Sequence, residues 1–104
     1  MTAKDFRLIA TSLAGASEGE HMAHPDFRVD GKVFATLGYP KRGWGMVRLT
    51  PAQQETFVRA HPEAFTPAAG AWGRNGSTLV HLRAVTKAVA RKAIVAAWEN
   101  GTRA

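Results

Sequence analysis

Two histidines with carboxylates close by in the sequence form the segment that comes closest to a metal site. His21 and His24 are three residues apart, and Glu18, Glu20 and Asp26 lie around them. Imidazole and carboxylate groups can together hold a metal ion. This spacing aligns two side chains on a helix, but the proline after His24 and the strand-like pattern beyond it argue against a helix. We therefore expect structural histidines, and predict no metal and no cofactor.

A nucleophile with a neighbouring base would indicate a hydrolase, and Ser77 and His81 are the nearest candidates. Alternation on a strand puts both on one face, but the strand rise separates them by about 13 Å. The glycines Gly70, Gly73 and Gly76 are evenly spaced, yet the Lys-Ser/Thr pair of a phosphate-binding loop does not follow them. The sequence contains no cysteine, which excludes thiol catalysis and zinc–thiolate sites. We predict that the protein is not an enzyme.

Basic side chains give the best functional indication. Lys and Arg number 14 against 8 Asp and Glu, for a net charge of +6. Such side chains contact phosphates with a salt-sensitive, largely sequence-independent affinity. The predicted nucleic-acid-binding residues are Lys41, Arg42, Arg74, Arg83, Lys87, Arg91 and Lys92. We predict weak DNA binding through the last helix and basic loops.

The first half of the chain predicts one helix and three strands. Thr2 and Asp5 form a capping box before apolar residues that recur at helical spacing through Leu13. Residues 27–29 then alternate, and Asp30-Gly31 predicts a type I′ hairpin turn into a strand at 32–37. A third strand is predicted at 44–49, with a bulge at Gly45.

The second half predicts a helix, one or two strands and a last helix. Thr50, Pro51 and Gln53 begin a helix that ends at His61. Residues 62–76 are predicted to be loop, 77–82 a strand and 86–99 the last helix. The fold class is therefore α+β: an antiparallel sheet of about five strands packed with three helices, in the order α-β-β-β-α-β(β)-α.

Length and composition are typical of one small domain. A chain of 104 residues, 45% of them hydrophobic, has enough apolar surface for one core. No stretch reaches the roughly 20 apolar residues of a membrane span, and the first residues lack the apolar core of a secretion signal. We expect a single domain over residues 1–104, monomeric and cytoplasmic.

The order of several motifs resembles the MmcQ/YjbR family over nearly the whole chain. The motifs are Glu18-Gly19-x-His21-x-x-His24-Pro25-x-Phe27-Arg28-Val29-x-Gly31-Lys32-Val33-Phe34-Ala35-Thr36-Leu37, Leu49-Thr50-Pro51-x-x-Gln54, Phe65-x-Pro67-x-x-Gly70 and Trp72-Gly73-Arg74-x-Gly76. The resemblance implies a YjbR/CyaY-like fold, related to frataxin-like and secretion-chaperone-like architectures, and a family often labelled DNA-binding. Relatives often carry an aromatic residue directly after the position of Gly76, where this chain has Ser77.

The resemblance also implies two alternatives to DNA binding. Secretion chaperones bind partner segments on a sheet face, so this domain could bind a protein partner. The family pattern also brings together a cleft for a small anionic ligand, in which Arg74 would pair with the anion. The predicted cleft residues are His24, Phe27, Trp72 and Arg74.

Overall fold

The chain folds into one six-stranded sheet with helices on both sides. The computed structural model describes residues 1–103, apart from the side chain of His21. The strands are β1 Ser17–His21, β2 His24–Val29, β3 Lys32–Leu37, β4 Trp44–Arg48, β5 Phe65–Pro67 and β6 Ser77–His81. The helices are α1 Ala3–Ser12, α2 Pro51–Ala60, α3 Gly70–Arg74 and α4 Lys87–Thr102.

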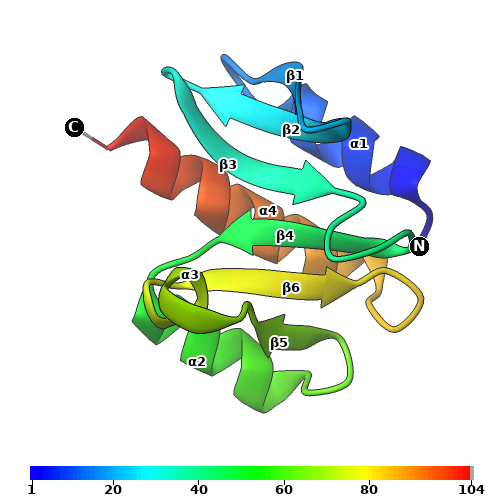
Figure 1. Ribbon diagram of the computed structural model, residues 1–104, viewed down its shortest axis with the longest axis vertical. Coiled ribbons are helices and arrows are strands. Elements are labelled where there is room, and N and C mark those ends of the chain that lie inside the picture. The colour runs from blue at the N-terminus through cyan, green and yellow to red at the C-terminus, as the bar shows by residue number, and fades with distance from the viewer. Residues whose placement is uncertain (104) are drawn as a thin grey trace.

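The sheet is antiparallel throughout, with the strand order β1-β2-β3-β4-β6-β5. Helices α1, α4 and α2 lie behind it in Figure 1, and the short α3 lies in front of one end of β6. The predicted α+β class is confirmed, with one more strand than expected and a short fourth helix. None of the helices within residues 1–103 is long and apolar enough to cross a bilayer.

Side-chain caps fix where three helices begin. The Thr2 hydroxyl accepts a bond from the amide of Asp5, whose carboxylate accepts one from the amide of Thr2. Thr50 and Gln53 form the same reciprocal pair at α2. Thr86 caps α4 through the amide of Val89. Such caps satisfy amides that have no partner within the helix.

The core lies between the sheet and the helices behind it. Alternation sends Phe27 and Val29 of β2, and Val47 of β4, to this side, where all three are at most 3% exposed. Phe6 of α1 packs against Phe27 with ring centroids 6.0 Å apart. Burying a large apolar side chain stabilises the fold by about 1.5–3 kcal/mol, so these strands are held mainly by their rear face.

Strand β1 was missed from the sequence. Its residues Ser17–His21 include two acids and a glycine and show no apolar alternation. The strand forms because its backbone pairs with β2 along its whole length and because Glu18 bonds Arg7 of α1 at 3.0 Å. Because β1 lies at the edge of the sheet, its position is set by this pairing and does not depend on an apolar face.

The bulge prediction at Gly45 is wrong. Strand β4 pairs in regular register with both neighbours, and the irregularity lies between β2 and β3 at Phe27/Arg28. There, Phe34 and Ala35 both turn toward the core. Gly45 instead lies in a tight space, since a Cβ there would lie 3.1 Å from the carbonyl oxygen of Thr36 and 3.2 Å from the ring of Phe6.

Candidate ligand-binding cleft on the open sheet face

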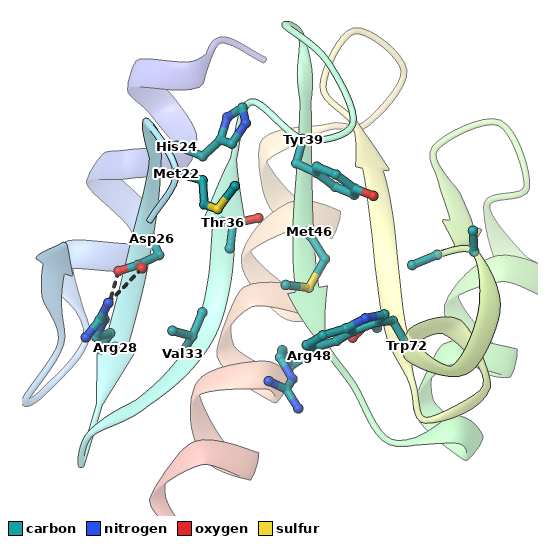
Figure 2. Close-up of a pocket in the computed structure, with 13 residues that line it drawn as sticks. Met22, His24, Asp26, Arg28, Val33, Thr36, Tyr39, Met46, Arg48 and Trp72 are labelled. Atoms are coloured by element: carbon teal, nitrogen blue, oxygen red, sulfur yellow. Dashed lines mark hydrogen bonds and ion pairs between the residues drawn. The ribbon is translucent and has the colours of Figure 1, made fainter. Parts of the chain in front are cut away.

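The front face of the sheet carries no helix over its centre, and it is hollowed into a cleft of about 590 Å³. The strands present their other alternate residues here, such as Asp26, Thr36 and Met46. Figure 2 shows the lining side chains converging from several elements. The cleft is lined by Met22, His24, Asp26, Arg28, Val33, Thr36, Tyr39, Met46, Arg48, Ala68, Ala69, Trp72 and Ser77.

A bidentate ion pair forms one side of the cleft. Arg28 Nε donates to Asp26 Oδ1 and its second terminal nitrogen donates to Oδ2, both at 3.0 Å. The carboxylate is buried, whereas the arginine side chain is 44% exposed. Gly19 of β1 leaves the space for this pair, since a Cβ there would lie 2.8 Å from Asp26 Oδ1. The pair therefore holds the guanidinium in one orientation at the cleft edge.

The same contact sets the protonation of Arg28. Its hydrogen bond to Asp26, reinforced by the opposite charge of that carboxylate, raises the pKa of the guanidinium above its ordinary value. Arg28 therefore stays charged, and both oxygens of Asp26 remain engaged. The carboxylate is not free to bind a cation entering the cleft.

The opposite side of the cleft is formed by Arg48 and Trp72. The Arg48 guanidinium lies 5.7 Å from the centroid of the Trp72 ring, within cation–π range. Arg48 forms no ion pair with any carboxylate of the described residues. A guanidinium without a carboxylate partner keeps its N–H donors available, so this arginine can bind an anion.

The strands diverge beside Arg48. Only Ala35, Thr36 and Leu37 of β3 pair with β4. The first residues of β3 are thus not paired with the end of β4. Val33, near the start of β3, lies between Arg28 and Arg48 in Figure 2. A second hollow of about 320 Å³ continues from here toward the end of α4.

Close backbone packing positions Trp72. Helix α3 docks so tightly that a Cβ on Gly73 would lie 1.7 Å from the carbonyl oxygen of Ala68. The side-chain amide of Gln54 donates to the carbonyls of both Gly73 and Ser77. With its next residue buried in this way, Trp72 itself projects outward and is 65% exposed.

Large apolar side chains rim the cleft. Three of the four exposed large hydrophobic side chains in the described residues belong to it: Met22 (78%), Tyr39 (53%) and Trp72. Met22 sits in the β1–β2 turn at φ 52, a conformation uncommon for residues other than glycine. Exposed apolar side chains gathered around a hollow are typical of a binding site.

Two of the four predicted cleft residues line the cleft. His24 and Trp72 do so. Phe27 does not line the cleft, because strand alternation turns its side chain to the rear face of the sheet, where it is 0% exposed. Arg74 does not line the cleft either, because it is an exposed residue at the end of α3.

The cations of the cleft are Arg28 and Arg48, and neither was among the predicted site residues. A signal was present: Arg28 follows Asp26 by two residues, as in a same-face pair on a strand. Ser77, at the position where relatives carry an aromatic residue, also lines the cleft. Its small side chain leaves space at the end of β6.

The seven predicted nucleic-acid-binding residues are all exposed but lie on different parts of the molecule. The loop with Lys41 and Arg42 lies beside the loop with Arg83, because the amide of Leu82 donates to the carbonyl of Gly43 at 3.1 Å. Lys87, Arg91 and Lys92 belong to α4 behind the sheet, whereas Arg74 belongs to α3 in front of it. Lys87 also lies 3.6 Å from Asp5.

Among the described side chains, the remaining candidates do not assemble into a reactive centre. Ser77 and His81 occupy opposite ends of β6, opposite Arg48 and Trp44 of β4 respectively. His81 stacks on Trp44 at 4.5 Å. No three metal-ligating side chains cluster among those described, and the side chain of His21 lies outside them.

The fold is similar to that of a known protein. A crystal structure of a Deinococcus radiodurans protein with a DUF419 domain superposes with a TM-score of 0.82 at 16% identity, covering 98% of this chain and 79% of that one. This likeness defines a YjbR-like α+β fold. The YjbR family model matches residues 11–100, and the chain belongs to the YjbR family. No curated protein sequence matches it.

Proposed function

We propose that the protein binds a small, partly apolar organic anion in the cleft on the open face of the sheet. The observation that carries this proposal is Arg48, which has no carboxylate partner among the described residues and lies 5.7 Å from the centroid of the exposed Trp72 ring. A free guanidinium beside apolar surface suits a ligand with an oxyanion at one end and an apolar body.

The size and composition of the cleft support the same proposal. Its volume of about 590 Å³ falls in the range of roughly 300–1,000 Å³ that ligand pockets occupy. Its lining combines apolar side chains with a few charged groups, the usual composition of such sites. We propose binding and no reaction, since binding accounts for the charged and apolar side chains that line the cleft.

Anilinonaphthalene sulfonate, an aromatic anion that fluoresces in apolar sites, provides the test. We expect saturable one-to-one binding to the intact protein, weakened at least several-fold by Arg48→Gln and by Trp72→Ala. Arg91→Gln, on the rear of the molecule, should bind as the wild type does. Binding that is unsaturable, or equal in all four proteins, would overturn the proposal. Cooperative unfolding of each variant confirms that the dye is not reporting a loosened core.

DNA binding remains a second candidate, supported by the adjacent loops that carry Lys41, Arg42 and Arg83. If about six cations contact phosphates, log K should fall with log salt at a slope of about −5. Duplex DNA titrated at several salt concentrations tests this. Replacing Arg91 and Lys92 by glutamate should abolish binding if α4 takes part. Binding that survives this change would exclude α4, and no binding at low salt would exclude the candidate.

A further inference from the structure

We infer that the ligand of the open-face cleft is a planar aromatic ring bearing a single carboxylate, with the ring lying on Trp72 and Met46 and the carboxylate on Arg48. This inference rests on the proposed function and narrows it to one chemical class. It follows from the charge of the cleft, from the kinds of apolar side chain that line it and from the position of Arg48, the one cation among its described lining residues that has no carboxylate partner.

The charge of the cleft matches a monoanion. Asp26, Arg28 and Arg48 carry its formal charge when His24 is counted as neutral. The Asp26–Arg28 pair is internally neutral, with both carboxylate oxygens occupied at 3.0 Å. Arg48 alone is left to be neutralised, and one carboxylate does this bidentately. A cationic ligand would find no free carboxylate, and a dianion would retain an uncompensated charge.

The apolar part of the cleft favours a flat ring over an aliphatic chain. Trp72 is 65% exposed and offers a ring face to the cleft, while Tyr39 is 53% exposed at the other rim. Aromatic pairs gain energy beyond that of the area they bury, and methionine sulfur makes favourable contacts with ring edges. Met46, on the floor between Thr36 and Arg48, supplies such a sulfur (Figure 2).

The position of Arg48 orients the ligand. Its guanidinium lies 5.7 Å from the centroid of the Trp72 ring, so its N–H donors are within reach of an anion held beside that ring. A carboxylate that shares the plane of an aromatic ring can accept these bonds while the ring covers the rest of the tryptophan. The carboxylate therefore lies at the Val33 side of the cleft, where β3 and β4 diverge.

Calorimetric titration of the intact protein with four matched compounds tests the class: naphthoate, its saturated analogue decalin carboxylate, naphthylmethylammonium and naphthyl phosphate. Naphthoate should bind tightest. Losing the flat ring should cost roughly threefold to tenfold in affinity, the size of an aromatic pair energy. The ammonium compound should not bind measurably. The phosphate, a dianion near neutral pH, should bind more weakly than naphthoate.

Two variants at one position separate the ring from its apolar area. Trp72→Phe should keep the preference for naphthoate over decalin carboxylate, and Trp72→Leu should remove it. If decalin carboxylate binds as tightly as naphthoate, the aromatic class is wrong while the proposed function stands. If the phosphate binds tighter, the single-carboxylate assignment is wrong. If none binds and Arg48→Gln leaves dye binding unchanged, both the class and the proposed function fail.

Discussion

The two faces of the sheet are built by the same strands and have opposite characters. On the rear face, β2 and β4 bury Phe27 and Val47 completely under α1 and α4. On the front face, the next residues along, Arg28 and Arg48, carry charge beside exposed aromatic rings. The rear face has an evident role in stability. The front face has none of comparable size, and this difference motivates the binding role proposed for it.

The glycines sharpen this contrast. Gly101 lets α4 approach β2 on the rear face, where a Cβ would lie 2.7 Å from Val29. Gly19 makes room for the Asp26–Arg28 pair, and Gly73 for the docking of the helix that bears Trp72. On the rear face, a glycine allows close packing of the core. On the front face, two glycines leave room for the groups that surround the cleft.

The largest expected effect is that of truncating an aromatic residue on the rear face. Phe27→Ala should lower the free energy of unfolding by about 3–5 kcal/mol, because it opens a cavity in the core. Trp72→Ala, the matched truncation on the front face, should change it by less than about 0.5 kcal/mol, as is usual for exposed positions. Urea denaturation measures both. Equal losses would show that the front face is part of the core.

A smaller effect is expected from displacing α3. Gly73→Ala should destabilise the protein by about 1–3 kcal/mol, as overpacking does, because the new Cβ meets the Ala68 carbonyl. Gly70→Ala is the control: its φ of +66 strains an alanine, but nothing lies within 4 Å of its Cβ. With Trp44 and Trp98 replaced by phenylalanine, so that the emission comes from Trp72, only Gly73→Ala should also shift the emission, and an unchanged spectrum would contradict the docking described.

Removing the free cation should affect binding without affecting the fold. Arg48→Gln should weaken naphthoate binding by about tenfold or more, the value of a charge-assisted hydrogen bond. Its unfolding midpoint should stay that of the wild type. Arg42→Gln removes another exposed arginine, one that does not line the cleft, and the affinity of this variant should be unchanged. A similar loss in both variants would point to net charge as the cause.

The smallest effect concerns acid stability at α1, behind the sheet. Hydrogen bonds from Thr2, chiefly from its backbone, together with the charge of Lys87, hold the pKa of Asp5 below its ordinary value of 3.8. A carboxyl whose pKa is lower in the folded state stabilises the protein above that pH, and the contribution disappears as pH falls through the folded pKa. Asp5→Asn should therefore be less stable than wild type near neutrality but not in acid.

Much of the rear face was predictable from the sequence. Capping boxes at Thr2 and Thr50 marked α1 and α2, and Asp30-Gly31 forms the predicted turn with φ of 51 and 77. These signals are local, since each depends on a few neighbouring residues. The helix at 86–99 was also predicted, and Ala90, Ala93, Ile94 and Ala97 of α4 are buried.

The front face was much less predictable, because it depends on contacts between distant segments. Gly70–Arg74 has too few residues and too much glycine to predict a helix, and α3 exists because Gln54 and Ala68 hold it. Arg48 and Trp72 lie 24 positions apart in the sequence and meet only through the pairing of β4 with β6. The net positive charge of the chain favoured a prediction of exposed loop and helix cations as the site. It gave no indication of Arg48 and Trp72.

Amide NMR mapping of a naphthoate titration tests the central claim most directly, because it shows which face of the sheet is occupied. The account predicts saturable shifts in β2, β3, β4 and α3, centred on Thr36, Met46 and the indole N–H of Trp72. Shifts concentrated on Arg91 and Lys92 of α4, or none at all in the strands of the open face, would contradict it.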